Sequence, residues 1–368
     1  MKHLLFACAF PLLLIGCAPQ EPVRIGFVAG VSGRFADLGG TGRNGALLAV
    51  EQRNQAGGIN GRKVELLVRD DEQDPDKARA AIKDLAAQQV VAIVGPMTSA
   101  MGAAIIPTLQ ETGLTAVAGT VTTTSLTGKD DNFFRVIGST HIYARNNAIE
   151  SARRFGAGRA AIIIDLANRD YTESWMRDFK AAYEEKGGKV QDVVTFDSRQ
   201  PRNYKLIAEQ TLAGKPQLVG LACSATDGAL LAQKLRQAAP KMALTGGGWV
   251  GSERLLELGG EAVEGLLVEQ YFNRNDQSER YLAFARAFQA RFGGEPGYAG
   301  VAGYDAANVV MTALAGDARR ENLKATLLKM RIFRGLQDEI RFDEFGDADR
   351  RLYLTEIRSG RFQPLPGQ

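Results

Sequence analysis

Histidine and cysteine are scarce in this sequence, and several kinds of chemistry depend on them. Only two histidines occur among 368 residues, so neither a histidine metal site nor a histidine general base is expected. Of the three cysteines, Cys8 and Cys17 lie in the N-terminal segment, which leaves Cys223 without a partner for an intramolecular disulfide. Because Cys223 follows an apolar run, we predict that it is a buried structural thiol.

Charge of one sign and nucleotide-binding loops are also missing. The 45 lysines and arginines nearly balance the 42 acidic residues, and no basic run is interleaved with aromatics, so no nucleic-acid partner is expected. No Walker-type loop and no G-x-S-x-G elbow occurs. Residues 40–45 match G-x-G-x-x-G, but they begin well after Val28, whereas a dinucleotide site needs this loop directly after its strand. We predict that the protein is not an enzyme and that it holds neither a cofactor nor a metal.

Long hydrophobic runs are absent except at the N-terminus. Residues 4–15 form an apolar segment of signal-peptide length, too short to span a bilayer as a mature helix. The segment ends in Leu-Ile-Gly before Cys17, which resembles the lipobox of bacterial lipoproteins. Residues 1–16 are therefore a predicted lipoprotein signal peptide, and residues 17–22 a tether that begins at lipidated Cys17; an ordinary secretory signal cut near Ala18 is the alternative. Either way the mature protein lies in the periplasm or another extracytoplasmic space, and in the first case lipid alone attaches it to the membrane.

Apolar strands alternate with helices through most of the remaining chain. Strands are predicted at residues 23–29, 63–69, 90–94 and 114–117, and the same alternation restarts at residue 160. The chain is too long for one ordinary core, so two domains are expected. Short links between strands and helices predict an α/β fold with two Rossmann-like lobes, each a parallel sheet wrapped by helices.

Two further segments carry specific predictions. Residues 30–40 are a predicted glycine-rich loop that precedes a helix at 44–54. Near the C-terminus, residues 337–342 and 351–357 are predicted strands that pair as an antiparallel hairpin. Asp305 is a predicted helix cap.

Hydroxyl-bearing residues follow strands of the first half. Thr98 and Ser99 stand where a helix at 100–111 begins, and a helix start offers unpaired N–H groups and the positive end of the dipole. Thr120 and Thr122 follow the next strand, and the carboxyl ends of parallel strands converge on one crevice. These groups predict a site for a small polar ligand, especially a carboxylate. The alternatives are a plain helix cap at Ser99 and a solvated threonine loop.

Two aromatic residues occupy similar positions in the second half. Tyr171 starts a helix after a strand, and Trp249 ends the glycine-rich turn at 246–249. Both are predicted to cover a ligand from the opposite lobe, because aromatics give contact area with little loss of entropy. Packing in the core or at the rim is the alternative for each.

A family resemblance rests on motifs that occur in a fixed order. They are Val31-Ser32-Gly33, Asn44-Gly45, Gly57-Gly58-Ile59-Asn60-Gly61, Asp70-Asp71 with Asp74-Pro75, Val94-Gly95-Pro96 with Ser99, Phe134-Arg135, and Glu264-Gly265-Leu266. With them, nearly all the mature chain resembles the branched-chain amino-acid (Leu/Ile/Val)-binding group of type I periplasmic binding proteins, the substrate-binding lipoproteins of ABC transporters. The resemblance implies a monomer with two lobes joined by three crossovers, a small-molecule ligand between the lobes, and delivery to an ABC permease complex. Residues 23–140 and 273–334 would form lobe 1, and residues 141–272 and 335–368 lobe 2.

The resemblance also implies roles for single residues. Ser99 matches the serine that receives the ligand carboxylate, Thr120 and Thr122 match contacts to both charged ends, and Tyr171 matches an aromatic of the second lobe. The full expected set of ligand-binding residues is Leu38, Thr98, Ser99, Thr120, Val121, Thr122, Tyr171, Gly248 and Trp249.

The chain departs from the family pattern where the ligand ammonium would lie. Leu38 stands in place of an aromatic, a tyrosine expected after Cys223 is missing, and the loop at 246–249 lacks the acidic residue that holds the ammonium. Burying an ammonium without a carboxylate partner is costly, so leucine, isoleucine and valine are disfavoured while another amino-acid-like or carboxylate ligand still fits. Asp227 is the candidate replacement acid. A ligand-sensing receptor of the same fold, not coupled to transport, is the alternative function.

Overall fold

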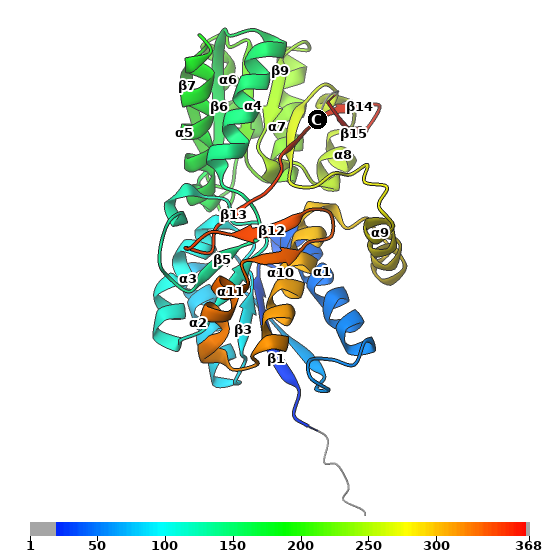
Figure 1. Cartoon of the computed structure of the whole chain (residues 1–368). Helices are drawn as coiled ribbons and strands as arrows, with labels where there is room; N and C mark the ends of the chain where they lie inside the picture. The colour runs from blue at the N-terminus through cyan, green and yellow to red at the C-terminus, as the bar shows by residue number, and fades with distance from the viewer. Residues whose placement is uncertain (1–19, 366–368) are drawn as a thin grey trace, which may run out of the picture.

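The computed structural model describes residues 20–365, which form two α/β lobes (Figure 1). The predicted signal peptide and Cys17 lie outside the described residues. Lobe 1, at the bottom of Figure 1, contains a parallel sheet with strand order β2-β1-β3-β4-β5. Its strands are β1 (Val23–Ala29), β2 (Val64–Asp70), β3 (Ala92–Val94), β4 (Ala116–Ala118) and β5 (Phe133–Arg135). Its helices are α1 (Ala36–Gln55), α2 (Pro75–Ala87), α3 (Ser99–Thr112), α9 (Glu279–Phe292), α10 (Gly297–Gly316) and α11 (Leu323–Met330).

Lobe 2 contains a larger sheet with strand order β15-β14-β10-β9-β8-β6-β7. Its strands are β6 (Arg159–Asp165), β7 (Lys189–Phe196), β8 (Leu218–Ala222), β9 (Ala243–Gly246), β10 (Leu267–Gln270), β14 (Tyr353–Arg358) and β15 (Arg361–Pro364). Its helices are α4 (Thr140–Phe155), α5 (Arg169–Glu185), α6 (Tyr204–Ala213), α7 (Ala225–Ala238) and α8 (Glu253–Gly259). The strands from β6 to β10 are parallel, and β14 pairs antiparallel with β10. The predicted α/β fold with two lobes is confirmed. No helix between residues 20 and 365 is both long and apolar enough to cross a membrane.

The C-terminal segment differs from its prediction. A small sheet of β11 (Ile332–Arg334), β12 (Glu339–Phe342) and β13 (Ala348–Asp349) packs on lobe 1, where the ring of Phe342 meets Phe134 at 5.3 Å. Because β12 pairs with β11 and β13 while β14 joins the sheet of lobe 2, the predicted hairpin is wrong. The contact between Phe342 and Phe134 packs this small sheet against β5.

The predicted loop at residues 30–40 is shorter in the structure, because α1 begins at Ala36. Figure 1 shows α1 beside α10, and glycines allow this close approach. A Cβ at Gly45 would lie 2.0 Å from the carbonyl oxygen of Gly300, and one at Gly303 would lie 2.1 Å from that of Gly42. Of the G-x-G-x-x-G pattern, Gly42 and Gly45 therefore lie in the contact between these two helices.

Gly45→Ala is expected to lower the free energy of unfolding by about 1–3 kcal/mol, because the new methyl group would press on backbone that cannot move cheaply. Gly40→Ala is the matched control on the same helix, since a Cβ there meets nothing within 4 Å. The control should gain up to about 1 kcal/mol from the higher helix propensity of alanine. Urea unfolding of both variants measures the difference, and equal effects would contradict the packing role of Gly45.

Candidate ligand-binding site

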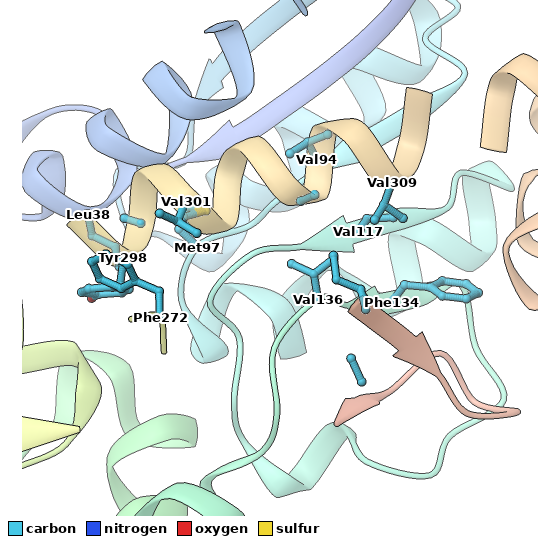
Figure 2. Packing of buried hydrophobic residues seen from close by; sticks show 14 of the residues in the cluster. Leu38, Val94, Met97, Val117, Phe134, Val136, Phe272, Tyr298, Val301 and Val309 are labelled. Atoms are coloured by element: carbon cyan, nitrogen blue, oxygen red, sulfur yellow. The ribbon is translucent and has the colours of Figure 1, made fainter. Parts of the chain in front are cut away.

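Residues from both lobes surround a small space, called the main cavity below. It is lined by Leu38, Met97, Ser99, Thr120 and Tyr298 of lobe 1 and by Asn168, Tyr171, Trp249 and Tyr271 of lobe 2. Figure 2 shows Leu38, Met97 and Tyr298 gathered at one end of α10. The wall is mostly aromatic and aliphatic, and none of its side chains is a carboxylate, an ammonium or a guanidinium. Such a wall suits a ligand with an uncharged body.

Ser99 stands at the first turn of α3, next to the N-cap residue Thr98. Its Oγ accepts hydrogen bonds from the backbone N–H groups of Thr122 and Thr123, both at 3.3 Å. The hydroxyl of Thr120 donates to the carbonyl oxygen of Met97. The two loops that follow β3 and β4 are thus joined at the N-terminus of α3, where partial positive charge favours an anion.

Direct contacts join the lobes beside this helix start. The Oδ1 atom of Asn168, in lobe 2, accepts from the N–H of Ala100 in the first turn of α3 at 3.0 Å. The Oγ atom of Ser174 accepts from the N–H of Thr124 at 3.1 Å. The structure is therefore a closed arrangement in which a lobe 2 amide takes one of the free donors of α3.

Thr98 does not line the main cavity. Its hydroxyl donates to Gln73 Oε1 at 2.8 Å, and the backbone and side-chain N–H groups of Gln73 donate to Asp71 Oδ1 at 2.8 and 3.3 Å. Asp71 is fully buried, and burial raises the pKa of its carboxyl to about 7. Thr98 thus positions the loop before α3.

Three other residues of the predicted set also lie outside the lining of the main cavity. Val121 is buried in the core of lobe 1. The Oγ1 atom of Thr122 is buried and has no hydrogen-bond partner within residues 20–365. Gly248 donates its N–H to Glu269 Oε2 at 3.1 Å. The lining therefore includes Leu38, Ser99, Thr120, Tyr171 and Trp249 from that set.

Glu269 on β10 is a buried acid that sequence reasoning missed. Its oxygens accept from Trp175 Nε1 at 2.7 Å, from Asn147 Nδ2 at 3.2 Å and from the N–H of Gly248. Burial raises the pKa of Glu269 to about 7. An acidic residue inside the apolar run at 266–270 was the available signal. Because its oxygens already serve three donors, Glu269 holds the 246–249 loop and does not line the main cavity.

The aromatic residues of lobe 2 pack on one another. Tyr171 meets Trp249 edge-on with ring centroids 6.0 Å apart, and Trp249 stacks on Phe35 of lobe 1 at 5.9 Å. Burial raises the pKa of the Tyr171 hydroxyl well above its ordinary value, so it stays protonated. Cys223, behind this layer, is a buried free thiol whose pKa burial also raises.

Asp227, the candidate replacement acid, is already paired. Its carboxylate accepts from Ser224 Oγ at 2.6 Å and from the Tyr204 hydroxyl at 2.7 Å, and it forms an ion pair with Arg34. It does not line the main cavity. The missed residues of the wall are Met97, Asn168, Tyr271 and Tyr298.

Comparisons with known proteins agree with this architecture. A family model described as periplasmic binding protein matches residues 22–361. The leucine-, isoleucine-, valine-, threonine- and alanine-binding protein of Pseudomonas aeruginosa is 26% identical over 332 residues, which cover 89% of this chain and 87% of that protein. The chain therefore belongs to the periplasmic binding protein family.

Solved structures extend the likeness to the whole fold. The branched-chain amino acid transporter substrate binding protein LivJ of Streptococcus pneumoniae, in complex with isoleucine, has a TM-score of 0.86 at 21% identity and covers 93% of this chain and 98% of its own. A solute binding protein of an ABC transporter from R. palustris, in complex with benzoate, has a TM-score of 0.84 at 20% identity, with 94% and 96% covered. The chain thus shares the two-lobed fold of these solute-binding proteins.

Proposed function

We propose that this protein captures a small carboxylate in the main cavity and delivers it to an ABC permease. The observation that carries the proposal is Ser99, which lines the main cavity at the first turn of α3 and joins the loops that follow β3 and β4. The family resemblance predicts that Tyr171 covers the ligand, and the position of Trp249 in a turn after a strand predicts the same role for Trp249.

Apart from its carboxylate, the ligand carries no charge; an aromatic or branched monocarboxylate is an example. No carboxylate lines the main cavity, and the nearby buried acids, Glu269 and Asp227, are already bonded to protein donors. An α-ammonium would therefore lose its hydration without gaining a partner. The benzoate complex of the R. palustris protein shows that this fold accommodates such an acid.

The proposed localisation is extracytoplasmic, with lipid on Cys17 as the membrane anchor. The sequence before residue 17 supports this through its apolar segment and its lipobox pattern. Membrane fractionation of cells that express Cys17→Ser should find this variant in the soluble extracytoplasmic fraction; retention in the membrane would refute the anchor.

Ser99→Ala is expected to weaken binding of the best acid by about 10- to 100-fold, the value of a hydrogen bond to a charged group. Ligands are first found by thermal shift across small carboxylates and amino acids, because a ligand at 100 times its Kd stabilises by about 2.7 kcal/mol. Calorimetry then gives the Kd of each variant. Ser125→Ala is the control, since it removes a nearby hydroxyl that does not line the main cavity. Unchanged affinity in Ser99→Ala would overturn the site.

A further inference from the structure

A second small space between the lobes, called the second cavity below, adjoins the main cavity. The two cavities share Leu38, Trp249 and Tyr298 as walls, so only side chains of the site itself separate them. The second cavity also reaches Arg34 and Asp37, which carry charge. The space between the lobes is therefore longer than the main cavity alone, and its far end is polar.

Arg34 is held in place across the seam between the lobes. It lies in the turn after β1, and its Nη2 donates to Asp227 Oδ1 at 2.5 Å and to the Tyr204 hydroxyl at 2.8 Å, both in lobe 2. The side chain of Asp227 is fully buried and also pairs with Arg202 at 3.3 Å. These contacts fix the guanidinium of Arg34 at the wall of the second cavity.

One buried donor of this guanidinium lacks a partner. Arg34 Nε is buried and has no hydrogen-bond partner among residues 20–365. A buried donor of a charged group is costly when it is left unpaired. Asp37, the other charged residue of the wall, already accepts from Ser252 Oγ at 2.6 Å. At this end of the cleft, Arg34 Nε therefore lacks a hydrogen-bond acceptor.

We infer that the second cavity is a subsite for the far end of the ligand, where Arg34 donates to a hydroxyl or carbonyl oxygen. The ligand class is then a carboxylic acid with an apolar or aromatic body and an oxygen acceptor at the end opposite the carboxylate. This inference rests on the proposed function, which places the carboxylate at Ser99. Arg34 is thereby a specificity-determining residue that contacts the ligand.

Paired acids that differ only in the distal group test the subsite. The probes are benzoate and 3-phenylpropionate, each with a 4-hydroxyl or a 4-methyl group. Within each acid the two distal groups are similar in size, and the two acids differ in the length of the body. At the length that fits, the wild-type protein should bind the hydroxyl compound about 10-fold more tightly than the methyl compound. Arg34→Met should bring this ratio close to one, and calorimetry measures both affinities.

Arg202→Met is the matched control, because it removes an arginine from the same Asp227 cluster without touching the wall of the second cavity. This variant should keep the preference for the hydroxyl compound. The subsite would be overturned if the wild-type protein showed no preference for the hydroxyl compound. It would also be overturned if Arg34→Met lost affinity equally for both compounds, and Arg34 would then be a contact that closes the lobes. Acids that bind without the preference refute the inference alone, whereas failure of every acid to bind refutes the proposed function.

Discussion

Arg350→Met is expected to lower the free energy of unfolding by about 3–5 kcal/mol, the usual result of removing one partner of a buried ion pair. Arg350 Nη1 donates to Asp305 Oδ2 at 2.8 Å, and the side chains of the two residues are only 6% and 1% exposed. Asp305 was predicted to cap a helix, but it lies inside α10 and ties the last crossover to lobe 1. Methionine would leave its carboxylate buried with the N–H of Leu336 as its remaining partner.

Urea unfolding of three variants measures this effect. Arg341→Met removes one partner of an exposed pair with Glu339 and is expected to change stability by less than about 1 kcal/mol. The double variant Arg350→Met/Asp305→Asn should recover part of the loss, because no unpaired charge is left and an amide oxygen still accepts from Leu336. A loss below 1 kcal/mol in Arg350→Met would show that the pair contributes little.

Asp71→Asn is expected to stabilise the protein at pH 8 by as much as ~4 kcal/mol. Burial raises the pKa of Asp71 from its ordinary value of 3.8 to about 7. Between these two pH values the folded state keeps a proton that the unfolded state has released, so wild-type stability falls as pH rises from about 4 to about 7. Asparagine cannot ionise, and the variant avoids this fall.

Denaturant unfolding at pH 5 and pH 8 tests the sign. The gain should be larger at pH 8 than at pH 5 by about 3 kcal/mol, because folded Asp71 is still protonated at pH 5 and ionises near pH 7. Some fall with pH should persist in the variant, because Glu269 titrates in the same window. Asp74→Asn, in the same loop, is the control: hydrogen bonds from two backbone N–H groups lower the pKa of this exposed helix cap, so its neutralisation should bring no gain at pH 8. A gain in Asp71→Asn that is equal at both pH values would contradict the assignment.

Local patterns were enough to predict much of the fold and one side of the site. The apolar run at 23–29 is β1, and the strand–turn–helix pattern around Ser99 is β3, a loop and α3. Thr120, Tyr171 and Trp249 were predicted to meet because each follows a strand, and the carboxyl ends of parallel strands lie at one edge of a sheet. All three line the main cavity. Residue type and spacing along the chain carry this information.

Features set by distant partners were not predictable in this way. Arg34 meets Asp227 across 193 positions of sequence, and Glu269 reaches the loop at 246–249 because β10 lies beside β9. The start of α1 was missed because Gly39 and Gly40 resemble loop residues, whereas both lie in the helix. The predicted hairpin was wrong because β14 pairs with β10, which is distant in sequence, and not with β12.

The glycine contact between α1 and α10 also bears on the order in which the chain becomes compact. Lobe 1 is built from two separate parts of the sequence, and α1 has no partner for its glycine face until residues 297–316 have been synthesised. In contrast, the strands from β6 to β10 follow one another without interruption. Closing the long loop between α1 and α10 costs entropy that only their contact repays. In a growing chain, lobe 2 can therefore assemble its central sheet while lobe 1 is still incomplete.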